Sequence, residues 1–229
     1  MVLNDRQAEM AEFIKKNSRV SVKKLAEKFY VSEMTVRRDL KEMEKLGYVR
    51  RYNGGALARN DDLLPVEDRR LLHNKEKDML SKRAKKYLRD GMTVFIDSSS
   101  TGLYIIPLLA EYKNITVVTN SVLCLLTAAK YHISCIATGG RFVERDMCTV
   151  GREAERVLSG INPDLSVFSA QGISDDGVIS DSDEAQTEVR RAAMLNSATN
   201  LFLFDGSKQH KKFPFTVCRA EEASDIIVI

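Results

Sequence analysis

Apolar residues recur at helical spacing three times within the first sixty residues. The stripes fall within residues 4–17, 21–30 and 32–47, and charged residues occupy most of the positions between them. Their members are Ala8, Met10, Ala11, Phe13 and Ile14, then Leu25, Ala26 and Phe29, and then Val36, Leu40 and Met43. The spacing predicts three short helices that bury these faces against one another.

The residues at the ends of these helices define a compact motif. Ser21 and Ser32 can accept hydrogen bonds from the free amides of the second and third helices, which a two-residue break separates. Gly47 ends the third helix, and residues 48–58 are typical of two short strands around an Asn-Gly turn. We therefore expect a winged helix-turn-helix, in which the third helix enters the major groove of DNA.

The third predicted helix has a polar side opposite its apolar stripe, and cations gather on that side. An arginine there suits a bidentate contact with a guanine edge, while hydroxyls at the helix N-terminus suit phosphate or base contacts. Arginines on the first wing strand suit a phosphate or the adjacent minor groove. The candidate DNA-binding residues are Ser32, Met34, Thr35, Arg37, Arg38, Lys41, Arg50 and Arg51.

The charge of the chain is unevenly distributed. Residues 1–60 hold 14 lysines and arginines against 8 acids, a net charge of +6, and the remainder has a net charge of −3. For a single arginine, a solvated helix face or an ion pair with Asp39, Glu42 or Glu44 is the more ordinary role. The helices, the caps, the wing and the clustered cations together favour duplex DNA as the partner.

A connecting arm is predicted next. Residues 58–73 lose the helical period, mix charges and include Pro65. The arm also has an apolar content that predicts packing on a domain or on a partner subunit, through Leu63, Leu64, Leu71 and Leu72. The predicted division of the chain is a DNA-binding domain at residues 1–57, the connector at residues 58–73 and an effector domain at residues 74–229.

From residue 74 onward, helix-like and strand-like segments alternate. Helices are predicted within residues 75–91, 98–112, 121–131, 151–160 and 184–198, and strands within residues 93–97, 115–119, 133–140, 165–172, 200–207 and 225–229. This alternation predicts an α/β domain with a mainly parallel sheet and helices on both of its faces.

Small and polar residues follow five of the predicted strands. In open α/β sheets the ligand lies beyond the carboxyl ends of the strands, and hydroxyls and amides at a helix N-terminus can hold a phosphate. One such loop alone is more typical of an N-cap or a turn, but five at one sheet edge predict a site for a phosphorylated small molecule. The candidates are Asp97, Ser98, Ser99, Ser100, Thr101, Thr119, Asn120, Ser121, Gly139, Gly140, Gln171, Gly172, Asp205 and Lys208.

The first part of the chain resembles a known family. The residues that carry the resemblance are Val31-Ser32, Thr35-Val36-Arg37-Arg38-Asp39-Leu40, Leu46-Gly47, Arg50 and Gly54-Gly55-Ala56. This pattern, nearly complete over residues 18–56, resembles the signature of the DeoR/GlpR family of bacterial repressors. In that family the segment binds operator DNA, and the Thr-Val-Arg-Arg-Asp-Leu stretch is the recognition helix.

The second part resembles the effector domain of the same family, which is similar in fold to ribose-5-phosphate isomerase. Its Asp-Ser-Ser-Ser-Thr, Thr-Asn-Ser, Gly-Gly and Asp-x-Ser-Lys elements stand in the same order. The resemblance implies that residues 98–101 and 119–121 cradle a phosphate, and that Asp97, Glu184 and Lys208 line the sugar. Two departures leave the sugar unidentified: Gln171 replaces what is more often a small residue, and residues 140–151 belong to a stretch that varies widely.

These features together predict a transcriptional repressor of carbohydrate-metabolism genes whose operator affinity a phosphorylated sugar modulates. It would have no catalytic residue and no cofactor, and operator half-sites imply a homodimer or a homotetramer. Two alternatives stay open. Asp97, Glu184 and Lys208 are chemically adequate for proton transfer, so a sugar-phosphate isomerase with a DNA-binding appendage is one. A nucleoid-type DNA-binding protein with no effector is the other.

The remaining features limit other functions. We expect reduced thiols with no metal or disulfide role at Cys124, Cys135, Cys148 and Cys218, because their spacing is not that of metal ligands. No apolar run approaches the ~18–20 residues of a membrane span, and the acidic N-terminus is unlike a signal peptide, so a cytoplasmic location is expected. Family members usually continue beyond the strand that ends at Ile229, so a naturally short chain and a truncated one both stay open.

Overall fold

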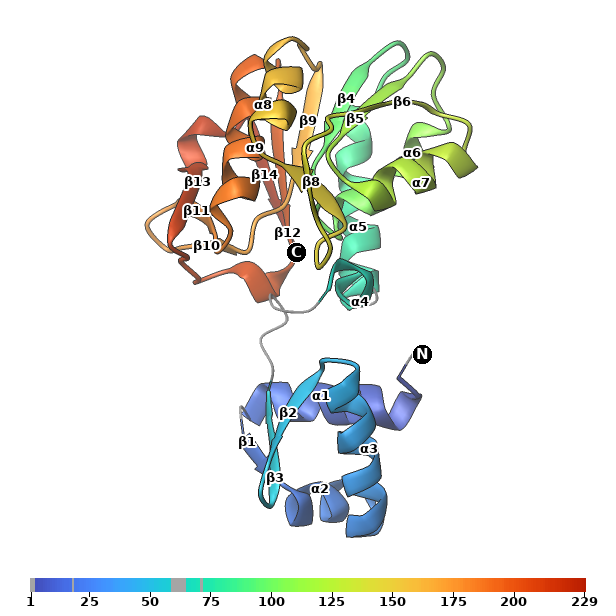
Figure 1. The fold of residues 1–229 in the computed structure, drawn as a ribbon, viewed down its shortest axis with the longest axis vertical. Helices are drawn as coiled ribbons and strands as arrows, with labels where there is room; N and C mark the ends of the chain where they lie inside the picture. The colour runs from blue at the N-terminus through green and yellow to red at the C-terminus, as the bar shows by residue number, and fades with distance from the viewer. Residues whose placement is uncertain (1–2, 18, 59–64, 71) are drawn as a thin grey trace. The chain divides into compact units, whose positions relative to one another are not determined.

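The computed structural model describes residues 3–17, 19–58, 65–70 and 72–229, and Figure 1 shows its fold. Contacts divide the chain into two compact units, Met1–Leu64 and Pro65–Ile229. Of the four connector leucines, Leu72 lies within the described residues, whereas Leu63, Leu64 and Leu71 lie outside them. The boundaries predicted for the DNA-binding domain, the connector and the effector domain stay predictions.

The first unit is a winged helix-turn-helix, as predicted. Its elements are α1 (Asp5–Asn17), β1 (Arg19–Ser21), α2 (Val22–Phe29), α3 (Glu33–Lys45), β2 (Val49–Tyr52) and β3 (Gly55–Ala58). The strands form an antiparallel sheet in the order β1-β3-β2, and β2 and β3 are the wing. Only glycine fits where β1 approaches β3, because a Cβ on Gly55 would lie 2.2 Å from the carbonyl oxygen of Val20.

The core of the first unit confirms most of the predicted stripes and corrects one position. Its buried apolar residues include Met10, Ile14, Leu25, Val36, Leu40 and Met43. Ala8 was predicted to be buried, but it is exposed and Gln7 is buried instead. The reason is polar, since Gln7 Nε2 donates to Glu42 of α3 at 2.9 Å. β1 was not predicted, because three residues are too few to reveal a strand period.

The second unit is built on a central sheet with the strand order β14-β12-β9-β4-β5-β6. Every pair of neighbours in it is parallel, which confirms the predicted α/β class. The strands are β4 (Thr93–Ile96), β5 (Thr116–Thr119), β6 (Ser134–Ala137), β9 (Leu165–Phe168), β12 (Asn200–Phe204) and β14 (Asp225–Val228).

Helices cover both faces of this sheet, as predicted (Figure 1). They are α5 (Asn74–Ala84), α6 (Ile106–Leu109) and α7 (Val122–Lys130) on one face, and α8 (Arg152–Ser159) and α9 (Glu184–Asn196) on the other. Successive strand residues alternate between the two cores, so Val94 faces the first and Phe95 the second. In the second core the rings of Phe168 and Phe202 stack with centroids 5.0 Å apart.

Two predicted helices are shorter than expected. The helix predicted over residues 75–91 ends as α5 at Ala84 and continues only as the 3-10 turn η2 (Lys85–Tyr87), because Leu88 is extended and buried. The helix predicted over residues 98–112 is replaced by the 3-10 turn η3 (Gly102–Tyr104) and the short α6. Pro107 explains this break, since its ring nitrogen cannot bond to the preceding turn but is tolerated in the first turn of α6.

Several small elements that were not predicted follow strands of the central sheet. The hairpin of β7 (Arg141–Val143) and β8 (Cys148–Val150) comes after β6. A second sheet, in the order β10-β11-β13, uses segments after β9 and β12, namely β10 (Gly172–Ile173), β11 (Val178–Asp181) and β13 (Phe215–Arg219). A short helix, α4 (Val66–Arg69), lies within the predicted connector. The hairpin and the second sheet follow carboxyl ends of central strands, so they border the edge where the effector is predicted.

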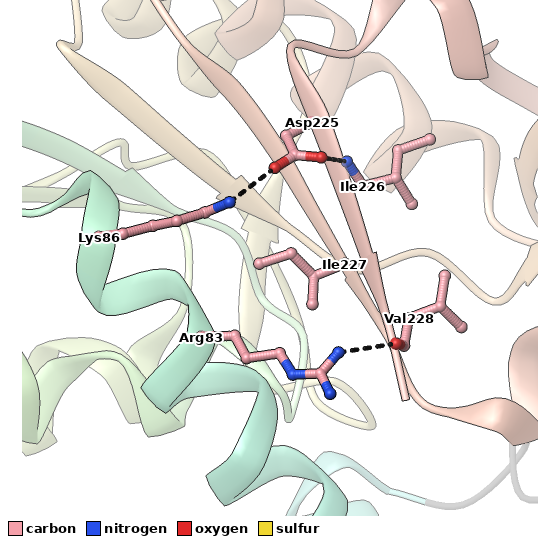
Figure 2. A pocket seen from close by; sticks show the side chains of 6 residues that line it. All are labelled: Arg83, Lys86, Asp225, Ile226, Ile227 and Val228. Atoms are coloured by element: carbon pink, nitrogen blue, oxygen red, sulfur yellow. Dashed lines mark hydrogen bonds and ion pairs between the residues drawn. The ribbon is translucent and has the colours of Figure 1, made fainter.

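A groove of about 390 Å³ lies along the edge strand β14 (Figure 2). Arg83 of α5 donates to the carbonyl oxygen of Val228 at 3.5 Å, and Lys86 Nζ lies 3.4 Å from Asp225 Oδ2. The lining contains none of the residues predicted to bind the effector. This groove is therefore separate from the residues predicted to bind the effector.

Candidate nucleic-acid interface and effector site

The second and third helices begin at capped serines, as predicted. Ser21 Oγ accepts a hydrogen bond from the amide of Lys24, and Ser32 Oγ accepts one from the amide of Thr35, each at 3.2 Å. The hydroxyls of Ser32 and Thr35 also lie 3.0 Å apart. These bonds satisfy amides that the first helical turn leaves free, and they hold both hydroxyls of the candidate interface at the start of α3.

The outward side of α3 holds four of the predicted DNA-binding residues. Met34 is 78% exposed, and Arg37, Arg38 and Lys41 are exposed as well. Arg37 lies 3.2 Å from Glu33, an exposed pair that contributes little stability. Arg38 and Lys41 have no ion-pair partner among the described residues. Their charges are therefore uncompensated in the free protein.

The wing is joined to α3 through Glu44. Its two carboxylate oxygens accept from the backbone amide of Arg51 at 2.8 Å and from Arg51 Nε at 2.7 Å. Both bonds lower the pKa of Glu44, and the side-chain bond has the larger effect. Arg50 is exposed, and as the neighbouring strand residue it points to the opposite face of β2. The two wing arginines therefore differ: Arg51 is paired on the α3 side, and Arg50 is not.

Asp39, inside the Thr-Val-Arg-Arg-Asp-Leu stretch, has a structural role that the sequence did not reveal. It is 2% exposed and accepts from Arg6 Nε at 2.9 Å and from Arg6 Nη2 at 3.2 Å. The sequence offered Asp39 as an ion-pair partner for the arginines of α3. Its partner is Arg6 of α1, so Asp39 fixes α3 against α1 and leaves the outward arginines free of it.

In the second unit, the sheet order places three predicted loops side by side. The segments after β9, β4 and β5 leave adjacent parallel strands at the same edge. Residues 97–101 follow β4, residues 169–172 follow β9, and residues 119–121 end β5 and lead to α7. Strands β4, β5 and β6 proceed in one direction from β4, and β9, β12 and β14 proceed in the other. The sheet therefore has its topological switch point between β4 and β9.

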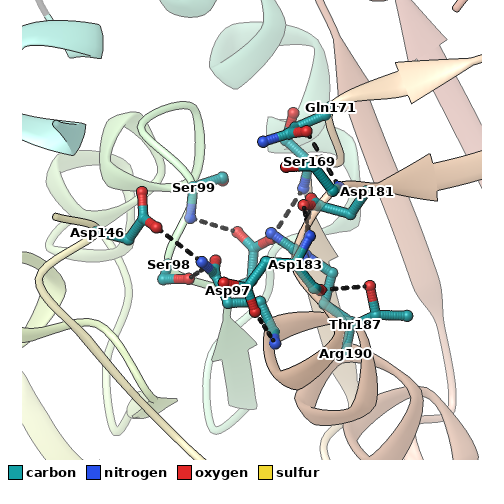
Figure 3. A network of polar contacts seen from close by, with 12 residues as sticks. Asp97, Ser98, Ser99, Asp146, Ser169, Gln171, Asp181, Asp183, Thr187 and Arg190 are labelled. Atoms are coloured by element: carbon teal, nitrogen blue, oxygen red, sulfur yellow. Dashed lines mark hydrogen bonds and ion pairs between the residues drawn. The ribbon is translucent and has the colours of Figure 1, made fainter. Parts of the chain in front are cut away.

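Asp97 is the centre of a buried polar network at this switch point (Figure 3). Its Oδ2 accepts from Arg190 Nε at 2.9 Å and from the amide of Ser169 at 3.2 Å, and its Oδ1 accepts from the amide of Ser99 at 3.0 Å. Arg190 Nη1 also lies 3.2 Å from Asp181 Oδ2, an ion-pair contact without hydrogen-bond geometry. Burial opposes the charge of Arg190, but Asp181 and Asp97 outweigh burial and raise its pKa.

The loop after β4 contains both engaged and unengaged hydroxyls. Ser98 Oγ donates to Gln186 Oε1 at 3.1 Å, and Ser99 Oγ accepts from the amide of Gly102 at 3.0 Å. The hydroxyls of Ser100 and Thr101 make no hydrogen bond within the described part of the chain, although the residues are only 6% and 4% exposed. These two hydroxyls can therefore donate to a ligand without breaking an existing bond.

The loop after β5 combines scaffold bonds with one unpaired acceptor. Thr119 Oγ1 donates to the carbonyl oxygen of Ile96 at 2.6 Å, which ties β5 to β4, and Ser121 Oγ caps α7 at the amide of Cys124. Asn120 Nδ2 donates to the carbonyl oxygen of Thr149, while Asn120 Oδ1 is buried without a hydrogen-bond partner. A buried acceptor normally has a hydrogen-bond donor, and a ligand at the carboxyl edge of the sheet can provide that donor.

The remaining predicted residues are arranged less uniformly. Gly140 has a φ of +108°, and a Cβ there would lie 2.6 Å from the carbonyl oxygen of Val150, so only glycine fits beside β8. Gln171 Oε1 accepts from the amide of Ser182 at 3.1 Å. Burial opposes ionisation of Asp205, but the hydrogen bond from Ser207 outweighs burial and lowers its pKa. Gly139 has a φ of +68°, Gly172 begins β10, and Lys208 ends the 3-10 turn η4 (Gly206–Lys208).

Glu184 is not part of this network. It is exposed as the first residue of α9, and it makes no hydrogen bond or ion pair among the described residues. Gln186, two residues later, instead reaches Ser98. The sequence did not identify Gln186, Arg190 or Asp146 as site residues. One signal was present: residues 186, 190 and 193 follow i, i+4, i+7 spacing, so the stripe that faces the sheet contains Gln186 and Arg190 in place of apolar residues.

Among the described residues, no group of three or more His, Cys, Asp or Glu side chains is arranged to hold a metal ion. No helix in the same ranges is long and apolar enough to cross a membrane. The four cysteines are free thiols.

Comparison with known proteins assigns both units. A family profile of the DeoR-like helix-turn-helix domain matches residues 6–61, and that of the DeoR C terminal sensor domain matches residues 72–228. The uncharacterized HTH-type transcriptional regulator YulB of Bacillus subtilis (strain 168) is 29% identical over 211 residues, which cover 91% of this chain and 81% of the relative. The glycerol-3-phosphate regulon repressor of Escherichia coli (strain K12) is 29% identical over 199 residues, 86% of this chain and 79% of the relative.

Among solved structures, a D-ribose-5-phosphate isomerase in complex with phospho-erythronic acid is 20% identical. It aligns with a TM-score of 0.46 over 59% of this chain and 54% of that chain. The sensor-domain profile alone spans more than half of the chain, and the helix-turn-helix profile covers the unit that contains α3 with its exposed Arg38 and Lys41. The chain therefore belongs to the DeoR family of helix-turn-helix transcriptional regulators.

Proposed function

We propose that this regulator represses genes of carbohydrate metabolism, and that a phosphorylated sugar bound in the second unit changes its affinity for operator DNA. The strand order carries this proposal. Ligands of open α/β sheets bind beyond the carboxyl ends of the strands at the topological switch point. Here that point lies between β4 and β9, directly before the predicted loops at residues 97–101 and 169–172.

The unengaged groups at this edge support phosphate and sugar as the ligand chemistry. The hydroxyls of Ser100 and Thr101 can donate to phosphate oxygens, and the backbone amides of the same loop can add to them. Asn120 Oδ1 can accept from a sugar hydroxyl. A buried acceptor without a donor costs about 1–3 kcal/mol, so a ligand that supplies the donor gains affinity from it.

The first unit supports sequence-specific binding to duplex DNA. Arg38 and Lys41 of α3 are exposed and uncompensated, as a recognition helix requires. A repressor should prefer its operator to other duplexes by roughly 10³-fold or more, whereas a nucleoid-type protein should bind all duplexes alike. Operator half-sites related by symmetry favour a homodimer or a homotetramer, acting in the cytoplasm.

The isomerase alternative has weaker support. A general base needs a lone pair within reach of the proton that it removes. The carboxylate of Asp97 already accepts from Arg190, Ser99 and Ser169, and Glu184 is exposed outside the network. The curated relatives named above are regulators by their names. We therefore propose sensing without catalysis.

A thermal-shift screen of the full chain tests the effector. Glycerol 3-phosphate, ribose 5-phosphate and fructose 6-phosphate are compared with the corresponding unphosphorylated compounds. A ligand at 100-fold its Kd stabilises the folded state by about 2.7 kcal/mol, which should raise the Tm by roughly 5–10 °C. If no phosphorylated compound raises the Tm, the sensing half of the proposal falls.

The active compound is then added to the protein bound to a duplex that the protein itself selects from a random library. The operator Kd should change by a factor of about 5–150, because linkage makes the two bindings affect each other equally. Interconversion of the sugar phosphates above the uncatalysed background would instead favour the isomerase.

A further inference from the structure

We infer that Gln186 and Asp146 are positioning residues. They transmit the structural effect of effector binding from the loop after β4 to α4, the first helix of the second unit. The inference rests on the proposed function, because it needs a phosphate at Ser98. Three hydrogen bonds form the path. Ser98 Oγ donates to Gln186 Oε1 at 3.1 Å, and Gln186 Nε2 donates to Asp146 Oδ2 at 2.9 Å. Figure 3 labels Ser98 and Asp146, the two partners of this side-chain amide. Arg69 of α4 donates to Asp146 Oδ1 at 2.6 Å.

The path is shielded from water. Ser98 and Asp146 are each 2% exposed, Gln186 is 6% exposed, and the side chain of Arg69 is 17% exposed. When one partner of a buried hydrogen bond turns away, water cannot easily take its place. The groups on either side of that bond must therefore rearrange together. Asp146 is also shared, since Arg145 Nη2 donates to its Oδ2 at 2.7 Å. A change at Gln186 therefore alters how one carboxylate is divided between two arginines.

Helix α4 is held by the segments that border the predicted site. The amide of Val66 donates to the carbonyl oxygen of Arg145 at 3.0 Å, in the turn between β7 and β8. Tyr104 of η3, which follows the loop after β4, donates to the carbonyl oxygen of Arg70 at 3.2 Å. Lys77 of α5 donates to the carbonyl oxygen of Arg69 at 2.5 Å. Any movement of these segments is therefore passed to α4.

Competition for the hydroxyl proton of Ser98 would start the rearrangement of these hydrogen bonds. The hydroxyl of Ser98 can donate to Gln186 or to a phosphate oxygen, but not to both at once. When a phosphate takes that bond, Gln186 Oε1 loses its donor and the side-chain amide reorients. Its bond to Asp146 then changes, and the carboxylate redistributes between Arg145 and Arg69. Residues 59–65 separate β3 from α4 in the sequence, so α4 is the first helix after the DNA-binding unit.

The test uses Gln186→Leu in the full chain, with Glu188→Leu on the same helix as the matched control. Each protein is titrated with the selected duplex in the presence and absence of glycerol 3-phosphate, ribose 5-phosphate and fructose 6-phosphate, and with inorganic phosphate at matched ionic strength. In Gln186→Leu the active compound should change the operator Kd by less than about twofold, against about tenfold or more in the wild type and the control. Without effector, Glu188→Leu should bind the duplex as the wild type does.

A second readout separates transmission from a merely structural role. Amide hydrogen exchange over residues 66–70 should change on effector binding in the wild type and in Glu188→Leu, but not in Gln186→Leu. Calorimetry should show that Gln186→Leu still binds the active compound. If Gln186→Leu fails to fold, Arg69→Met at the other end of the path should give the same uncoupling.

The possible results are distinct. An effector response in the folded path variant equal to that of the wild type, with exchange at α4 still changing, would overturn the inference and leave the proposed function intact. If the wild type binds none of the compounds, the proposed function falls first, and this inference falls with it.

Discussion

The two units use their polar side chains in opposite ways. In the first unit, the residues predicted to meet DNA stand outside the core and make few bonds. Arg38 and Lys41 have no ion-pair partner among the described residues, and Arg37 has only an exposed one. In the second unit, most residues predicted to meet an effector are buried, and many of them hydrogen-bond to groups of the surrounding scaffold. Asp97 alone accepts three hydrogen bonds, and Thr119 ties two strands together.

The kind of partner explains this difference. DNA is recognised across a surface, so the side chains that contact it stay solvated until it arrives. A small molecule is enclosed, so its site lies among groups that must be hydrogen-bonded whether or not the ligand is present. An exposed, uncompensated cation is therefore a clearer functional signal than a buried hydroxyl, which can equally serve the scaffold.

The largest effect is expected for Arg190→Met, which should destabilise the second unit alone. The substitution leaves Asp97 and Asp181 buried without their cation, and removing one partner of a buried ion pair costs about 3–5 kcal/mol. The unfolding midpoint of the second unit should fall by roughly 6–20 °C in calorimetry. The midpoint of the first unit should not move.

Arg156→Met on α8 is the control, because Arg156 is exposed and has no ion pair among the described residues. It should change the stability of the second unit by less than about 0.5 kcal/mol. A loss in Arg190→Met as small as that of the control would contradict the structural role assigned to the Asp97 network.

Arg38→Ala should have the next largest effect, and it should act on binding and not on folding. Loss of a bidentate base contact costs about 1–3 kcal/mol, so operator affinity should fall about 5- to 150-fold and discrimination between operator and other duplexes should be lost. Lys16→Ala on α1 removes the same charge from another exposed position. It should leave discrimination unchanged. Fluorescence titrations with the selected duplex and a scrambled one measure both quantities, and full discrimination in Arg38→Ala would refute the assigned recognition face.

Most of the first unit could be predicted from its sequence, because local signals determine it. The stripe of Val36, Leu40 and Met43, the caps at Ser21 and Ser32, and the Asn-Gly wing all occur where they were expected. Two contacts between distant parts of the chain were not predictable. Asp39 pairs with Arg6, 33 residues earlier, and Gln7 is buried in place of Ala8. No periodicity reveals such pairs.

The second unit shows the same limit more strongly. The alternation of segments predicted the parallel sheet and the loops at its carboxyl edge. The network at that edge depends on Asp146, Gln186 and Arg190, whose partners lie up to 93 residues away along the chain. The two small β elements that surround it are built from strands of two to five residues, which are too short to show a period. Sequence could therefore indicate the sheet edge where an effector site is expected, but it could not distinguish candidate ligand residues from scaffold residues.

A smaller effect separates folding from binding within the first unit. Ser32→Ala and Ser21→Ala each remove an N-cap bond of the same 3.2 Å length. Each should lower the free energy of unfolding by about 1 kcal/mol in urea titrations, because the cap amide loses its acceptor. Ser32 alone is among the predicted DNA ligands, so only Ser32→Ala should also weaken operator binding. Equal operator affinity in the two variants would show that Ser32 caps α3 and does not contact DNA.

The smallest effect concerns the reactivity of the cysteine thiols. All four cysteines lie in the second unit, so their reactivity reports on that unit alone. Burial raises the pKa of Cys124 and Cys218 to about 12 and that of Cys148 to about 11, and it also raises the pKa of the half-buried Cys135. Since the thiolate is the reactive form, iodoacetamide at pH 8 should label Cys135 first in the folded protein.

The same labelling connects the smallest effect to the largest. In Arg190→Met the three buried thiols should gain reactivity at temperatures where the wild type stays protected, because opening of the second unit restores both access and an ordinary pKa. Mass spectrometry of the labelled peptides measures this site by site. Equal reaction rates of Cys124 and Cys135 in the folded wild type would show that the core around Cys124 is open to solvent. The contrast between an enclosed second unit and an exposed DNA-binding face would then be wrong.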